Sequence, residues 1–221
     1  MIVIDTLRDA VSLGGPVIVI LFAISVLTLG VTFYKFWQFS ASGVGRHQRL
    51  SQALAAWDGG DAQTARARLS ESQSYLAPLL KSAMDEPGVP GLDGRLDAEA
   101  GLAIAGLERG FRFLDTVAQL APLLGLFGTV LGMIEAFQSL QDAGSTVDPS
   151  LLAGGIWVAL LTTAAGLAVA MPTSMVLSWF ESRMAAERAF ADKAVQTVLV
   201  PGQGNGAPGR RRDAHGEAAH V

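Results

Sequence analysis

One apolar stretch near the middle of the chain constrains the fold more than any other. It occupies residues 121–137 and reads APLLGLFGTVLGMIEAF. No charged residue occurs between Asp115 and Glu135, so a helix over this stretch would extend about 28 Å at about 1.5 Å per residue. That length is close to the thickness of one bilayer's hydrocarbon core. We therefore predict a membrane-spanning helix at the centre of the chain.

Three glycines give this predicted helix a bare flank. Gly125, Gly128 and Gly132 lie three and four residues apart, which places them on one side of a helix. Lipid supplies no hydrophobic force between helices, so association depends on small residues that let two backbones approach closely. The pattern predicts packing inside a membrane bundle, with a kink at Pro122 near the start of the helix.

The composition agrees with a membrane protein and argues against several other classes. Hydrophobic residues make up 50% of the chain and charged residues 16%. No basic patch with interleaved aromatic residues suggests nucleic-acid binding. His47, His215 and His220 lack the spacing of metal ligands, and the chain has no phosphate-binding glycine loop and no nucleophile with a base. We expect no enzyme, no metal and no cofactor.

A first apolar run precedes the central one. It carries no charge from residue 10 to residue 34 and closes on Tyr34, Lys35, Phe36 and Trp37. Aromatic and basic residues of this kind anchor the end of a spanning helix at the membrane interface. A signal peptide is the rival interpretation. We reject it because the basic n-region is missing and the apolar stretch is too long.

A third apolar run is uncharged over residues 149–180 and holds two adjacent hydroxyls, Thr162 and Thr163, near its middle. The central span has Thr129 at a similar depth. Taken singly, a threonine in a membrane helix usually bonds a carbonyl of its own helix. Together, these hydroxyls could line a thin water or proton path. Because a hydroxyl cannot hold a proton near neutral pH, a carboxylate on this chain or on a partner would have to carry it.

Residues 38–110 have a different character. Charged residues interrupt apolar ones at helical spacing, which predicts a small helical domain outside the membrane. Asp61 fits the N-cap of one of its helices, and residues 87–91 (PGVPG) form the clearest break. Residues 92–112 then read as a helix that continues without a strong breaker into the central span.

The predicted fold is all-α: an integral membrane protein with three transmembrane helices and a small cytoplasmic helical domain. The basic residues, apart from Arg8, lie in the middle domain, the span ends and the tail, so the positive-inside rule places these parts in the cytoplasm. The parts in order are a periplasmic segment (1–13), transmembrane helix 1 (14–37), the cytoplasmic domain (38–110), transmembrane helix 2 (111–137), a periplasmic loop (138–150), transmembrane helix 3 (151–180), a cytoplasmic helix (181–200) and a disordered tail (201–221).

Two motifs carry a family resemblance. Residues 120–137 (LAPLLGLFGTVLGMIEAF) and 154–172 (GGIWVALLTTAAGLAVAMP) resemble the MotA/TolQ/ExbB proton channel family. Their order and the three-span layout are more similar to the ExbB and TolQ branch than to MotA, which has four spans. Glycines and prolines fit helix packing and kinking in this arrangement, namely Pro122, Gly125, Gly128, Gly132, Gly166 and Pro172.

The resemblance implies a function in the bacterial inner membrane. It implies a pentameric, lipid-embedded ring around an ExbD- or TolR-like single-span partner with an essential aspartate. Proton flow past that aspartate would drive work on a periplasm-spanning protein such as TonB or TolA. The family's pore threonines correspond to Thr129 and Thr163. The alternatives are a non-conducting helical scaffold and a MotA-type flagellar stator subunit. The choice between ExbB and TolQ roles, and between proton and sodium, stays open.

One position departs from the family pattern. Where the family commonly has a glutamate in a WEALLTTA-like segment, this chain has Val158. Glu135 is the acidic residue nearest the predicted pore threonines by sequence count and lies at a depth similar to that of Val158. Helical rotation places Glu135 on the flank of Gly128 and Gly132, away from Thr129. It is a candidate entry-side carboxylate, although an end-of-span carboxylate reaching outer water is the simpler interpretation.

Overall fold

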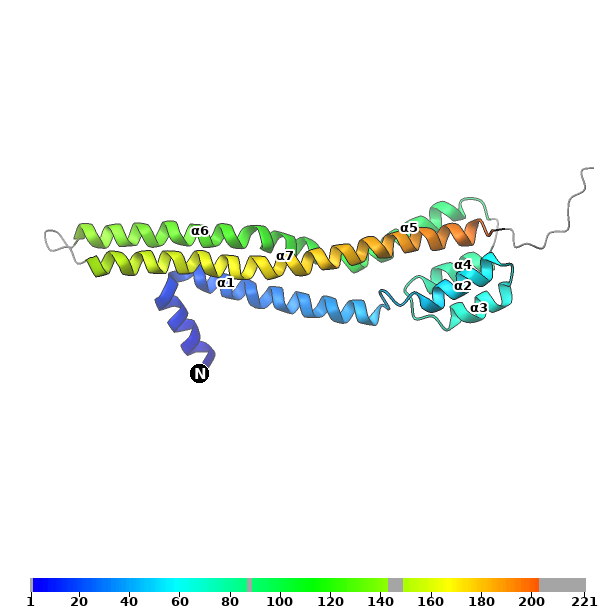
Figure 1. Cartoon of the computed structure of the whole chain (residues 1–221), viewed down its shortest axis with the longest axis horizontal. Coiled ribbons are helices and arrows are strands. Elements are labelled where there is room, and N and C mark those ends of the chain that lie inside the picture. The colour runs from blue at the N-terminus through cyan, green and yellow to red at the C-terminus, as the bar shows by residue number, and fades with distance from the viewer. Residues whose placement is uncertain (1, 87–88, 143–148, 203–221) are drawn as a thin grey trace, which may run out of the picture. The chain divides into compact units, whose positions relative to one another are not determined.

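The computed structural model describes residues 2–86, 89–142 and 149–202 and is helical, without strands, in these ranges. The helices in order are α1 (Ile2–Ala41), α2 (Gln48–Asp58), α3 (Ala62–Ser70), α4 (Ala77–Asp85), α5 (Leu92–Glu108), α6 (Phe111–Asp142) and α7 (Pro149–Leu199), as Figure 1 shows. The predicted all-α class is confirmed. Most of the predicted tail, with His215 and His220, and the middle of the predicted loop lie outside the described residues.

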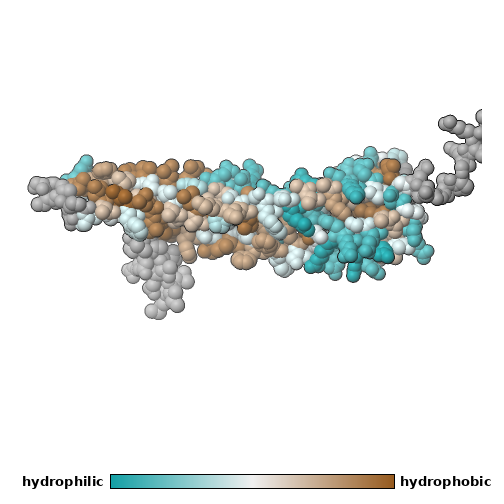
Figure 2. Space-filling view, viewed as in Figure 1, coloured by the Kyte–Doolittle hydropathy of each residue, from teal (hydrophilic) through white to brown (hydrophobic). Residues whose placement is uncertain are grey.

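Three of these helices are long and apolar enough to cross a membrane: Gly15–Ala41 of α1, Phe111–Asp142 of α6 and Leu152–Leu199 of α7. Large apolar side chains are exposed along all three, such as Phe33 on α1, with 70% of its surface open, and Met175 on α7, with 73%. Figure 2 shows apolar residues gathered over these helices. Such an extended exposed apolar surface is unusual for a soluble monomer and suits a bilayer.

The structure differs from the sequence prediction at the end of α6 and between α5 and α6. Helix α6 continues to Asp142, so the first residues of the predicted 138–150 loop are helical. Helix α5 ends at Glu108 and α6 begins at Phe111, so the predicted uninterrupted run from residue 92 into the central span is wrong. The break lies at Gly110, whose φ is +94°, a backbone conformation that glycine adopts without steric cost.

The chain divides into two compact units, and the first consists of residues 1–41 and 103–188. Its apolar packing joins α1 to α6 and α7, with Val17 and Leu21 buried against Val117, Ala121 and Ala170. A second contact is aromatic. The ring of Phe180 on α7 lies 5.6 Å from that of Phe111 on α6 and 5.2 Å from that of Phe39 on α1. These contacts hold the three spanning helices together.

The described part of the second unit consists of residues 42–86, 89–102 and 189–202. Its described core is aliphatic and includes Leu50, Leu69, Leu80 and Met84, each at most 1% exposed. The indole Nε1 of Trp57 on α2 donates to the carbonyl oxygen of Val198 on α7 at 3.2 Å. Asp61 is confirmed as the N-cap of α3 because its Oδ1 accepts from the Thr64 backbone N–H at 3.0 Å.

Candidate functional site

The candidate site is the contact between α6 and α7, which run antiparallel and side by side (Figure 1). The three glycines of α6 are buried and face small residues of α7. A Cβ added at Gly128 would lie 2.7 Å from the Cβ of Thr162, and one at Gly132 would lie 3.3 Å from the Cβ of Ala159. A side chain at Gly128 would force the helices apart and one at Gly132 would be tight, so these glycines permit the close approach that the sequence pattern predicted.

The close approach continues toward the start of α6. A Cβ on Gly125 would lie 2.9 Å from the carbonyl oxygen of Thr162, and one on Gly166 would lie 3.1 Å from the Cα of Gly125. Both helices thus supply glycines to the same layer. The two prolines that the sequence suggested as kinks are less buried than these glycines: Pro122 is half-buried and Pro172 is exposed. The small-residue face extends over more than two helical turns, which fixes the rotation of each helix against the other.

Two threonines of α7 reach across this contact. Thr162 is 1% exposed, and its Oγ1 donates to the carbonyl oxygens of Ala159 at 2.7 Å and Gly125 at 3.2 Å. Thr163 is partly buried, and its Oγ1 donates to the Gly125 carbonyl at 3.3 Å. The carbonyl of Gly125 therefore receives two hydroxyls from the neighbouring helix. Hydrogen bonds of this kind stabilise helix pairs in a membrane.

Thr129 has a different environment. Its Oγ1 donates to the carbonyl oxygen of Leu126, one turn back in its own helix, at 2.6 Å. Thr129 is half-buried and lies between the exposed side chains of Phe127 and Val130. The three threonines thus share one level of the α6–α7 pair but not one face. Thr162 is enclosed, whereas the Thr129 hydroxyl lies on the open side, where a second protein chain has access to it.

The acidic candidate is also outside the buried α6–α7 contact. Glu135 is exposed, and the next position, Ala136, is the one buried against Gly155 of α7. Its backbone carbonyl accepts from the hydroxyl of Ser139 at 2.9 Å. Val158, where the family pattern has glutamate, is half-buried beside Ala159 in the α6–α7 contact.

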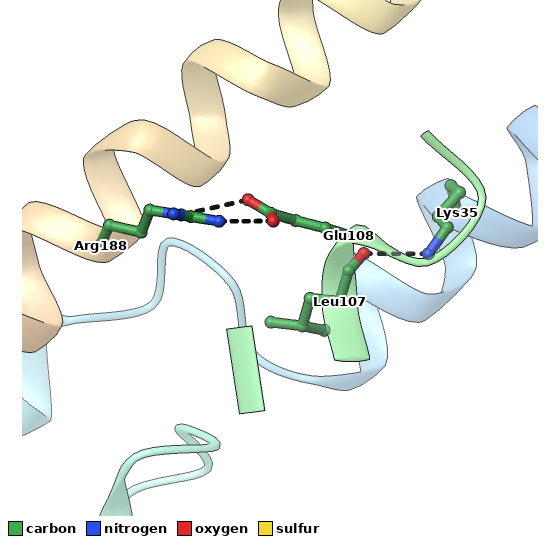
Figure 3. Close-up of polar contacts among 4 residues, drawn as sticks. All are labelled: Lys35, Leu107, Glu108 and Arg188. Carbon is green, nitrogen blue, oxygen red and sulfur yellow. Dashed lines mark hydrogen bonds and ion pairs between the residues drawn. The ribbon is translucent and has the colours of Figure 1, made fainter. Parts of the chain in front are cut away.

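Three charged side chains surround the α5–α6 break: Lys35, which the sequence suggested as an interface anchor, and Glu108 and Arg188, which no sequence pattern singled out. Lys35 is 2% exposed, and its Nζ donates to the carbonyl oxygen of Leu107 at 2.9 Å and to Oε1 of Gln38 at 2.8 Å. Arg188 of α7 forms a two-point ion pair with Glu108, from Nε at 3.2 Å and from Nη2 at 2.5 Å. Figure 3 shows both connections. Their residues are 72 and 80 positions apart, beyond the reach of helical periodicity.

Comparison with known proteins bears on this arrangement. Residues 60–192 match the MotA/TolQ/ExbB proton channel family, a range that includes all of α6 and most of α7. The chain is 33% identical over 175 residues to an ExbB-like biopolymer transport protein of Synechocystis, covering 75% of this chain and 66% of the relative. It is 31% identical over 154 residues to the biopolymer transport protein ExbB of Salmonella typhimurium, covering 68% and 62%.

A relative of the second branch is also similar. The Tol-Pal system protein TolQ of Haemophilus influenzae is 41% identical over 81 residues, covering 37% of this chain and 35% of the relative. The chain thus spans no more than about two thirds of the length of each of these three relatives. Similarity to both branches supports the membrane transport class and does not choose between ExbB and TolQ.

Proposed function

Because the chain belongs to the MotA/TolQ/ExbB proton channel family, we propose that it is the ring subunit of a proton channel that converts the proton motive force into work in the periplasm. The family is one of channel and transport proteins rather than enzymes, and the protein is a multi-pass protein of the inner membrane. In the proposed arrangement, five copies form the ring, with the N-terminus periplasmic and the C-terminus cytoplasmic.

The position of the threonine hydroxyls carries this proposal. The α6–α7 contact encloses Thr162 and leaves Thr129 on the open side, half-buried and bonded only to its own helix. A ring that brings the open faces of α6 together would align the Thr129 hydroxyls around a central path. Thr163, partly buried, would extend the same polar layer on α7. In this proposal Thr162 holds the two helices and Thr129 contacts the conducted species.

The proton carrier would come from another protein. A hydroxyl does not titrate near neutral pH, so a path lined by threonines needs a carboxylate that does. We assign that carboxylate to an ExbD- or TolR-like protein with one membrane helix, enclosed by the ring. A TonB- or TolA-like protein would then receive the motion in the periplasm. The similarity to proteins named biopolymer transport protein ExbB and Tol-Pal system protein TolQ supports these partners.

Reconstitution tests the proposal. The chain would be co-purified with a single-span protein encoded beside it, placed in liposomes, and assayed for proton uptake with a pH-sensitive dye under an imposed potential. Proton uptake by the complex, and none by the chain alone, is the expected result. A pure complex that assembles but conducts neither protons nor sodium would contradict the proposal. Sodium uptake without proton uptake would support a channel function with sodium, rather than the proton, as the conducted ion.

A non-conducting scaffold is the second candidate, and Val158 is the observation that favours it. The family pattern has a glutamate where this chain has a half-buried valine. The α6–α7 contact within each subunit does not involve an acidic side chain, so the packing of the subunit does not depend on that carboxylate. The same liposome assay separates the two functions, because a scaffold would bind the single-span partner without ion uptake.

A further inference from the structure

We propose that Lys35 and the Glu108–Arg188 ion pair form a clamp on the α5–α6 break that sets the rotation of α6, and hence the direction of Thr129. The inference rests on the proposed channel function for its effect on ion flux, but the clamp itself is a structural claim. Figure 3 shows its residues. Lys35 is a positioning residue here, since it does not contact the proposed path.

The environment of Lys35 is unusual for an ammonium group. Its side chain is 2% exposed, and in the part of the chain that the structure describes no carboxylate forms an ion pair with it. A buried charge must be compensated by hydrogen bonds or dipoles. Here the compensation comes from the Leu107 carbonyl, the amide oxygen of Gln38 and the ring of Phe111, whose centroid lies 5.6 Å from Nζ.

The Leu107 carbonyl is well placed for this role. It belongs to the last turn of α5, where carbonyl groups lack partners within the helix and the helix dipole is negative. Lys35 therefore caps the end of α5 from another helix. The cap connects α1 to Leu107, three positions before Gly110, where the chain turns into α6. If the end of α5 moved away, a buried ammonium would lose its main-chain acceptor.

The ion pair of Glu108 fixes the next residue from the opposite helix. Both guanidinium contacts, at 3.2 Å and 2.5 Å, meet different carboxylate oxygens, a planar geometry that restrains rotation as well as distance. Arg188 is 56% exposed and Glu108 27%, so solvent weakens the pair relative to a buried one. Its contribution is therefore geometric: α1 restrains Leu107, and α7 restrains Glu108.

The turn at Gly110 packs closely against the Lys35 side chain. A Cβ added at Gly110 would lie 3.3 Å from Cε of Lys35 and 3.7 Å from Cγ1 of Val31. One residue later α6 begins with Phe111, whose ring stacks on Phe180 of α7. Phe111 and Thr129 belong to the same helix, so the setting at Phe111 acts together with the glycine contact to α7 on the direction of Thr129. The clamp thus links the break to the polar layer.

The structural arm of the test uses paired spin labels, because the chain contains no cysteine of its own. Exposed Ala105 on α5 and exposed Gln119 on α6 would be changed to cysteine and labelled, and their separation measured by pulsed electron resonance. We expect a narrow distance distribution in the otherwise unchanged protein and in Lys35→Arg, and a broad one in Lys35→Met. Lys81→Met, at an exposed lysine, is the matched control.

The functional arm measures ion flux per assembled complex for the same variants. Lys35→Met keeps the bulk of the stem and removes the donors, so we expect normal assembly with most of the flux lost, and recovery in Lys35→Arg. A narrow distance distribution in Lys35→Met, normal flux in that variant, or equal loss in Lys35→Arg would each overturn the clamp. If the unchanged complex conducts nothing, the proposed function fails, and the label distances still decide the clamp.

A charge exchange at the ion pair tests the clamp without changing Lys35, so the test stands even if the Lys35 variants misfold. Glu108→Arg and Arg188→Glu each place like charges together, so each alone should broaden the label distances and reduce flux. The double exchange restores opposite charges and should recover much of both. Recovery in the double variant supports the clamp. If both single variants keep normal label distances and flux, or if a folded double variant recovers neither, the ion pair is not part of the clamp.

Discussion

Thr162 and Gly125 are joined across the α6–α7 contact, with the threonine hydroxyl 3.2 Å from the glycine carbonyl oxygen. The same hydroxyl lies 2.7 Å from the carbonyl of Ala159 in its own helix. One hydroxyl has a single proton, so the two carbonyls share it. Because Thr162 is also buried against Gly128, its hydroxyl is committed to packing and is not open to a conducted ion.

The threonines should therefore separate stability from flux. Thr162→Val keeps the shape and removes the hydroxyl, so we expect a loss of about 0.5–1.5 kcal/mol in unfolding free energy. Thr129→Val should leave the unfolding free energy unchanged, because the Thr129 hydroxyl bonds only its own helix. It should abolish flux, because this hydroxyl is the one proposed to contact the conducted ion. Unfolding in detergent and liposome flux provide the two measurements. Normal flux in Thr129→Val would make that threonine a packing residue.

The glycines of α6 should tolerate no added methyl group at the tightest point. In Gly128→Ala the new Cβ would lie 2.7 Å from atoms of Thr162, so one helix has to move. We expect a destabilisation of about 1–3 kcal/mol, the usual range for an overpacked contact. Gly154→Ala in α7 is the control, since a Cβ there meets nothing within 4 Å. Equal stability of the two variants in detergent unfolding would contradict the tight contact.

The topology can be tested by labelling. Gln141 at the end of α6 and Gln73 before α4 are both exposed. We expect a membrane-impermeant maleimide to label Gln141→Cys in intact spheroplasts and Gln73→Cys only after lysis. This follows from the absence of basic residues between α6 and α7 and their abundance before α5. The reverse labelling pattern would invert the proposed orientation.

Local sequence patterns predicted the elements well, because the signals lie within single helices. Hydropathy located the spanning helices, glycine spacing gave the flank of α6 that faces α7, and Asp61 marked the start of α3. Contacts between distant segments were not predictable. From the sequence, a lysine that ends an apolar run is interpreted as an interface anchor. Only the packed structure shows that Lys35 is buried at the end of α5.

Local sequence patterns also failed to predict the break at Gly110 and the different environments of the threonines. A single glycine inside a helical pattern does not by itself stop a helix, so the sequence predicts a continuous helix from residue 92. The structure ends α5 there with a φ of +94°. Likewise, Thr162 and Thr163 are adjacent in sequence, and which of them is enclosed depends on the rotation of the helix opposite.

Asp61 should make α3 sensitive to acid. Hydrogen bonds from Thr64, through its side chain first and its backbone second, hold the pKa of the Asp61 carboxyl below its ordinary value of 3.8. A depressed pKa in the folded state means that the stabilisation is present above the unfolded pKa and is lost as the pH falls through the folded one. Deuterium exchange of α3, corrected for intrinsic rates, should therefore accelerate below about pH 4.

The control for this acid effect keeps the acceptor and removes the titration. Asp61→Asn retains a side-chain oxygen for the Thr64 N–H, so α3 should stay capped and lose its dependence on pH below 4. Asp61→Ala removes the acceptor, and exchange in α3 should be fast at every pH. If acid accelerated exchange equally in Asp61→Asn, another group would be responsible for the effect.

Glu135 should modulate ion flux without being required for it. Its side chain is exposed beyond the buried glycine face, near the end of α6, where a carboxylate costs far less than at the bilayer centre. An exposed carboxylate there can attract protons toward the path. The carboxylate that relays protons near Thr129 has to come from the partner protein. We therefore expect Glu135→Gln to retain part of the flux in liposomes. Replacing the membrane aspartate of the single-span partner by asparagine should abolish the flux.

Val158→Glu completes this comparison, since it restores the acidic residue of the family pattern at a half-buried position beside the α6–α7 contact. If the partner's aspartate is the indispensable carboxylate, Val158→Glu should change the rate of flux but should not restore conduction when that aspartate is absent. Assembly is measured for every variant, so that a lost ring is not mistaken for a lost relay. Complete loss of flux in an assembled Glu135→Gln complex would instead make Glu135 the relay, and Val158 would then mark a carboxylate moved from α7 to α6.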